Sequence, residues 1–116
     1  MRNLHMEITE RTVGDVTILD LRGELQPKEP VELLKNNISS LLSSGKKKLV
    51  LNLERARIPP STVGTVIRAQ NTVEGQGGGL KLLKLTHAAS LLSIAELRNC
   101  FETFDREEAV IESFQR

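Results

Sequence analysis

LVLNL at residues 49–53, followed by IPPSTVG at residues 58–64, is the stretch that decides the fold. The first segment is almost entirely apolar, which is typical of a central strand covered by helices. After a short polar link, the second segment places two prolines and a Ser-Thr pair ahead of apolar residues at helical spacing, which predicts a helix from Ser61. Free backbone N–H groups and the positive end of a helix dipole meet at such a junction. We therefore expect the junction to accommodate negative charge, including a phosphate group.

Apolar spacing along the rest of the chain predicts strands and helices in near alternation. In chain order, the predicted elements are two hairpin strands joined at Gly14-Asp15, a helix over Pro27–Ser43, the strand at residues 49–53, the helix from Ser61, a strand over Leu80–Leu85, a helix over Ala88–Leu97, a strand over Cys100–Phe104, and a last helix with a capping box at Asp105 and Glu108. This order indicates an α/β fold with a mixed sheet, formed as one domain over residues 1–116.

Charge and composition narrow the class of partner. The 16 basic and 15 acidic residues give a net charge of +1, and three Phe are the only aromatic residues. Neither an attractive field nor a stacking surface for nucleic acid is therefore expected. The sequence shows no signal peptide and no apolar run long enough for membrane insertion, and its single cysteine cannot form an internal disulfide. These features favour a cytoplasmic protein.

No residue pattern in the chain predicts catalysis, a metal site or a cofactor. His5 and His87 lack further ligands at zinc spacing, and Cys100, within an apolar run, is interpreted as core filler. The glycine-rich residues 75–79 lie after a helix and before a strand, which is the reverse of a nucleotide-binding loop, so they predict a turn. We expect a binding module that is not an enzyme.

Several segments together resemble the sulfate transporter and anti-sigma factor antagonist (STAS) domain. The matching segments are DLRGEL at residues 20–25, LVLNL at 49–53, QGG at 76–78 ahead of LKL at 80–82, and Leu97 followed by Phe101 and Phe104. The resemblance implies a small mixed β-sheet with helices packed mainly on one face. It also implies partner switching: the unphosphorylated protein binds an anti-sigma factor, commonly a serine kinase, and phosphorylation of a serine or threonine at the strand-to-helix junction ends the binding.

The motif that this switch uses in the family differs here. The family motif is an Asp, the phosphorylated Ser, a Ser or Thr, a Gly, a hydrophobic residue and a Gly. Counting back from residues 76–78 places the acid at Pro59 and the acceptor at Pro60, with Ser61 at the next hydroxyl position.

Counting forward from residues 49–53 places the acid at Pro60, the acceptor at Ser61 and the following hydroxyl at Thr62. In both alignments a proline replaces the acid. Ser61 then has two interpretations: a helix N-cap, whose hydroxyl accepts a backbone N–H, or a phosphoacceptor, with Thr62 as the second candidate.

Two functions follow from the resemblance. The first is an anti-sigma factor antagonist, and its expected partner-binding residues are Glu24, Pro59, Pro60, Ser61, Thr62, Val63 and Thr65. The alternative is an accessory subunit of a transport ATPase or another assembly, in which a proline-rigidified loop makes a permanent contact without phosphorylation. Self-association into a homo-oligomer is compatible with both functions.

Overall fold

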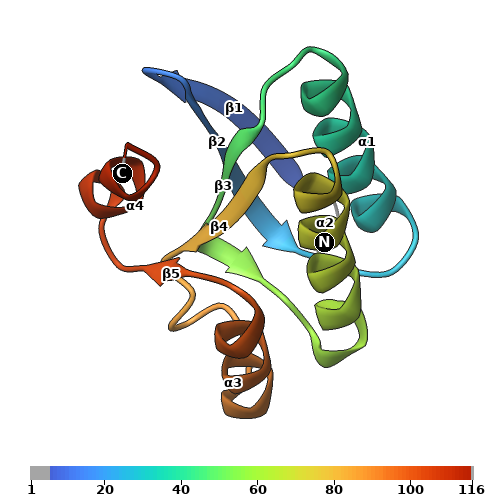
Figure 1. Ribbon diagram of the computed structural model, residues 1–116. Helices are drawn as coiled ribbons and strands as arrows, with labels where there is room; N and C mark the ends of the chain where they lie inside the picture. The colour runs from blue at the N-terminus through green and yellow to red at the C-terminus, as the bar shows by residue number, and fades with distance from the viewer. Residues whose placement is uncertain (1–5, 116) are drawn as a thin grey trace.

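A five-stranded sheet forms the centre of the protein, and the computed structural model describes residues 6–115 (Figure 1). His5 lies outside the described residues. The elements, in chain order, are β1 (Glu7–Val13), β2 (Val16–Glu24), α1 (Glu29–Ser43), β3 (Lys48–Arg57), the 3₁₀ helix η1 (Pro60–Thr62), α2 (Val63–Gly75), β4 (Gly79–Leu83), α3 (Leu91–Cys100), β5 (Thr103–Phe104) and α4 (Glu107–Ser113).

The strands lie in the sheet in the order β1-β2-β3-β4-β5. β1 and β2 form an antiparallel hairpin that turns at Gly14, whose φ is +62°. The neighbouring pairs from β2 to β5 are all parallel, and a helix lies in the chain between each of them. The mixed α/β sheet predicted from the order of elements is therefore confirmed.

Three helices cover one face of the sheet and α4 covers part of the other (Figure 1). Leu19, Leu49 and Leu51 point into the larger core beneath α1, α2 and α3. Ile18 and Val50, which alternate with them along β2 and β3, pack instead with α4 in a smaller core. The expectation of helices mainly on one face is thus correct, with α4 as the exception.

Arg11 of β1 joins α4 to the sheet. Its guanidinium donates to Asp20 on β2 at 2.6 and 3.1 Å and to Glu107 on α4 at 2.8 and 3.2 Å. These hydrogen bonds hold the pKa of the Asp20 and Glu107 carboxyls below their ordinary values. The two carboxylates therefore stabilise the fold in their charged form.

Stability should fall in acid because of this cluster. A carboxyl whose pKa is lowered by folding contributes stability above its unfolded pKa, here about 4, and loses that contribution as pH falls through the folded pKa. Arg11→Gln should lower the free energy of unfolding at pH 7 by about 1 kcal/mol, a small value because all three side chains are partly exposed. It should also flatten the decline in the free energy of unfolding below about pH 4.

Urea unfolding at several pH values measures both effects, and a pH dependence equal to that of the wild type would contradict them. Arg98→Gln, at an exposed position of α3, is the control.

Several predicted boundaries were wrong, among them the end of the strand predicted over Leu80–Leu85, since β4 ends at Leu83. The polar link after residue 53 is a continuation of β3, which runs to Arg57. α1 begins at Glu29 rather than at Pro27, because Lys28 has a φ of 76° and cannot lie within a helix. The last helix has no side-chain cap, so the capping box at Asp105 and Glu108 does not form.

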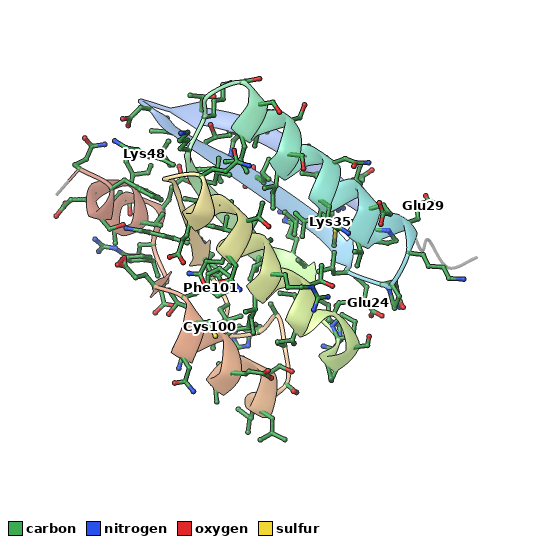
Figure 2. The ribbon with its side chains drawn as sticks, turned by 45° about the vertical axis from the view of Figure 1, so that its right-hand side comes forward. Glu24, Glu29, Lys35, Lys48, Cys100 and Phe101 are labelled. Atoms are coloured by element: carbon green, nitrogen blue, oxygen red, sulfur yellow. The ribbon has the colours of Figure 1, made fainter. Side chains whose placement is uncertain are left out.

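Cys100 is not core filler. α3 runs from Leu91 to Cys100 rather than from Ala88 to Leu97, and the thiol at its last position is exposed, next to the buried Phe101 (Figure 2). The strand that follows is only two residues long. The apolar run at Cys100 and Phe101 is therefore split between a helix end and the core.

The glycine-rich segment forms the predicted turn. Gly77 has a φ of +83°, and the N–H of Gly78 donates to the Val73 carbonyl at 3.0 Å, which closes the end of α2. The N–H of Gly79 then donates to the Lys47 carbonyl at 2.8 Å and starts the β3–β4 pairing. The glycines thus allow the chain to reverse direction between α2 and β4.

Candidate functional site

The junction after β3 is held by hydrogen bonds from three separate parts of the chain. The buried Ile58 donates its N–H to the Ala88 carbonyl, just before α3, at 2.7 Å. Leu25, directly after β2, donates its N–H to the Arg57 carbonyl at 2.8 Å. The ends of β2 and β3, the start of α2 and the approach to α3 are thereby brought together.

Thr62 fixes the turn from inside. Its Oγ1 donates to the Leu25 carbonyl at 2.8 Å and lies 3.3 Å from the Pro59 carbonyl, and the residue is only 2% exposed. Its hydroxyl is therefore out of reach of a kinase in this conformation, which disfavours Thr62 as a phosphoacceptor.

Replacing Thr62 by valine should destabilise the protein by about 1–2 kcal/mol, because a buried carbonyl loses its donor while the side-chain volume is kept. Chemical unfolding measures the change. Thr72→Val is a matched control: its hydroxyl also donates to a backbone carbonyl, that of Arg68 at 3.1 Å, but at an exposed position where water can replace it. Equal losses in the two variants would contradict the buried anchoring role of Thr62.

Ser61 is exposed, and the predicted N-cap is wrong. It lies inside η1, and neither η1 nor α2 has a side-chain cap. The reason is that α2 starts two residues later than expected, after a 3₁₀ turn that the two prolines favour. No hydrogen bond joins the Ser61 hydroxyl to another residue within 6–115. The side chain is therefore free to be modified without breaking the fold.

The 3₁₀ turn also changes the electrostatic expectation for the junction. The N–H groups of Thr62 and Val63 donate to the carbonyls of Pro59 and Pro60. Pro59 and Pro60 have no N–H of their own. Several of the donors that would have attracted an anion at the helix start are thus absent or already used, so the junction is less suited to hold a phosphate than its sequence predicts.

The structure brings the predicted partner-binding residues together, but not all of them face solvent. Pro60 and Ser61 are exposed, and Glu24, Pro59 and Thr65 are half-buried, whereas Thr62 and Val63 are buried. Glu24 lies at the end of β2 opposite Arg57, and its carboxylate accepts a hydrogen bond from Gln26 (Figure 2). The accessible part of the predicted surface is therefore its rim, with Ser61 at the tip of the turn.

Sequence reasoning missed two exposed apolar residues near the Ala88 contact with the junction, Leu91 and Leu92. They form the first turn of α3, three and four residues after Ala88, and each is 86% exposed. Ser93, Ile94 and Leu97 supply the buried side of this helix. Nothing in the sequence distinguishes the two leucines from core leucines at helical spacing, so only the late start of α3 reveals them.

Neither a metal site nor a membrane span is found in the described part of the chain. No three His, Cys, Asp or Glu side chains within residues 6–115 lie close enough to hold a metal ion. No helix over the same residues has the length and apolar character needed to cross a bilayer.

The structures similar to this one include anti-sigma factor antagonists, and no protein-family model and no curated protein matches the sequence. TM1081 from Thermotoga maritima, solved by NMR, has a TM-score of 0.78 at 22% identity, covering 100% of this chain and 94% of that one. An anti-sigma factor antagonist from Mycobacterium paratuberculosis has a TM-score of 0.75 at 10% identity, covering 97% and 96%.

The anti-sigma factor antagonist SpoIIAA of Bacillus is similar in both of its forms. The unphosphorylated form has a TM-score of 0.72 at 23% identity, covering 94% of this chain and 98% of that one. The phosphorylated form has a TM-score of 0.69 at 21% identity, covering 93% and 99%. The predicted STAS-like fold is therefore confirmed over nearly the whole chain.

Proposed function

We propose that the protein is a non-enzymatic regulator that binds an anti-sigma factor in the cytoplasm, and that this partner is a serine kinase. Its binding surface comprises Ser61 with the rim residues Glu24, Pro59, Pro60 and Thr65, together with Leu91 and Leu92; we call it the junction surface. The observation that supports the proposal most strongly is the exposed Ser61 hydroxyl, which is not used by the fold and lies on a rigid turn within this surface.

The physical properties of the junction surface suit a partner that must be bound and released. The proline turn is fixed by Thr62 before any partner arrives, so little conformational entropy is lost on binding. Leu91 and Leu92 offer apolar area that a partner can bury. A phosphate on Ser61 adds about −1.5 to −2 charges beside this apolar area, which opposes a packed contact.

The proposal includes partner switching through phosphorylation of Ser61. The proline at the position of the family's acid does not prevent it, because a kinase needs an accessible hydroxyl, and Ser61 supplies one. The reported structural neighbours are antagonists, which gives no support to the alternative of a transport-ATPase subunit.

Affinity purification from the native host, followed by mass spectrometry, tests the kind of partner. An anti-sigma factor with a kinase domain is expected, and recovery of an ATPase in its place would contradict the proposal. Incubation of the purified pair with ATP should give one phosphopeptide containing Ser61. Ser61→Ala should abolish it, while Ser39→Ala, at an exposed position of α1, should leave it unchanged.

The effect of the phosphate is a separate measurement. The partner should bind the unphosphorylated protein about 100-fold or more tightly than the phosphorylated one, equivalent to about 2.7 kcal/mol or more. Equal affinity for the two forms would rule out a switch at Ser61 even if the partner is correctly identified.

A further inference from the structure

A cleft of about 620 Å³ lies on the face of the sheet opposite α1 and α2, and none of the junction-surface residues lines it. α4 covers the first half of the parallel strands on this face, where Val16, Ile18 and Val50 pack against it. The second half, toward the carboxyl ends of β2 and β3, is left open.

A β-bulge places a second arginine, Arg55, beside Arg22 on the floor of this cleft. Asp20 pairs with Asn52, but Arg22, two residues on, pairs with Arg55, three residues on, so β3 has one extra residue at this point. The buried Leu53 and Ala56 bracket two exposed residues, Glu54 and Arg55, both of which line the cleft. Without the bulge, strict alternation would turn Arg55 toward the core.

Arg22 and Arg55 consequently lie opposite each other on adjacent strands, and both line the cleft. Like charges in direct register destabilise a sheet. The other cations that line the cleft are paired: Arg11 with Asp20 and Glu107, Lys84 with Glu54 at 3.5 Å, and Arg106 with Glu108 at 3.8 Å. Neither Arg22 nor Arg55 has an ion-pair partner among residues 6–115.

We infer that this arginine pair binds a small molecule with a doubly negative group, either a dicarboxylate or a phosphomonoester. Two guanidinium groups can each donate a fork of hydrogen bonds to such a group, and the anion removes the repulsion between them. The inference is independent of the proposed function, because no residue of the junction surface lines the cleft.

The other lining residues restrict the size of the ligand. Asp105, just before α4, and Glu108, in its first turn, line the cleft and repel a long polyanion. Glu7 lies opposite Arg22 on β1, so the ligand must compete with one carboxylate. Thr9 lies on β1 opposite Asp20 of β2 and also lines the cleft. Its hydroxyl is therefore placed to bind a polar group on the rest of the ligand. The volume suits a metabolite rather than a macromolecule.

The test is an NMR titration of the ¹⁵N-labelled protein with sodium succinate and, separately, with sodium phosphate, each at constant ionic strength set by sodium chloride. Saturable shifts are expected at Thr9, Arg22, Asn52 and Arg55. Saturation by succinate assigns the dicarboxylate class, and saturation by phosphate assigns the phosphomonoester class. Arg22→Gln and Arg55→Gln should each weaken binding about tenfold or more.

Arg57→Gln is the matched control, since Arg57 is an exposed arginine of the same strand outside the cleft. It should change the affinity less than about twofold. The inference is overturned if neither anion saturates, or if Arg57→Gln weakens binding as much as Arg55→Gln. It is also overturned if an acidic hexapeptide saturates the cleft while both small anions fail, because the site would then belong to a protein segment. Unchanged amide spectra of the free variants exclude unfolding as the cause of a loss.

Discussion

Replacing both Leu91 and Leu92 by aspartate should lower the affinity for the partner by about 100-fold or more, with little change in stability. Burial of a leucine side chain contributes about 1.5–3 kcal/mol, so a contact that uses both leucines depends heavily on them. Both side chains are exposed in the free protein, so the free energy of unfolding should change by less than about 0.5 kcal/mol. Isothermal titration with the copurified partner, together with urea unfolding, measures the two quantities.

Leu33→Asp provides the control for this double variant. Leu33 lies on α1, which contributes no residue to the junction surface, and is the third large apolar residue among those described that is exposed, at 36%. It should leave the affinity nearly unchanged. If the double aspartate variant binds as tightly as the wild type, α3 is outside the interface, and Leu91 and Leu92 do not belong to the junction surface.

Gly78→Ala should destabilise the fold by about 2–3 kcal/mol. A Cβ at this position would lie 2.5 Å from the Lys47 carbonyl oxygen, 2.9 Å from the Lys47 Cβ and 3.0 Å from the Val73 Cγ1. The first contact is with backbone, so it can be relieved only by moving the strand start where Gly79 and Lys47 pair.

Gly75→Ala separates this clash from the general effect of removing a glycine. A Cβ at Gly75 has nothing within 4 Å, and the residue is the last of α2. Alanine there should leave the protein unchanged or stabilise it by up to about 1 kcal/mol, since it is the better helix former. Thermal or chemical unfolding of the two variants decides the matter, and equal destabilisation would show that the close approach at Gly78 is not what selects glycine.

The central strand and the order of elements could be predicted because their signals are local. Residues 49–53 are apolar enough to require a buried strand, and the glycines at 75–79 sit where the chain must reverse. The bulge at Glu54 and Arg55 also left a signal, two consecutive charged residues inside a strand that otherwise alternates. Two adjacent charged residues after an apolar strand also predict a polar link, so this signal alone does not distinguish a bulge from the end of the strand.

Other features depend on distant parts of the chain and could not be predicted. Ser61 lies exposed in a 3₁₀ turn and does not cap α2, and Thr62 anchors that turn to Leu25, 37 residues away in the sequence. Cys100 has apolar neighbours in sequence and an exposed position in space, because α3 continues three residues further than predicted. The same displacement of α3 exposes Leu91 and Leu92. Sequence therefore located the junction, and tertiary contacts determined which of its side chains a partner can reach.

Hydrogen–deuterium exchange of the protein with and without its copurified partner is the most direct test of binding through the junction surface. Binding through the junction surface predicts slower exchange at residues 57–65 and 88–93, with no change in β1 or α4. Phosphorylation of Ser61 before the partner is added should abolish this protection. Protection confined to β1, α4 and the open face of the sheet, with residues 57–65 unaffected, would contradict binding through the junction surface.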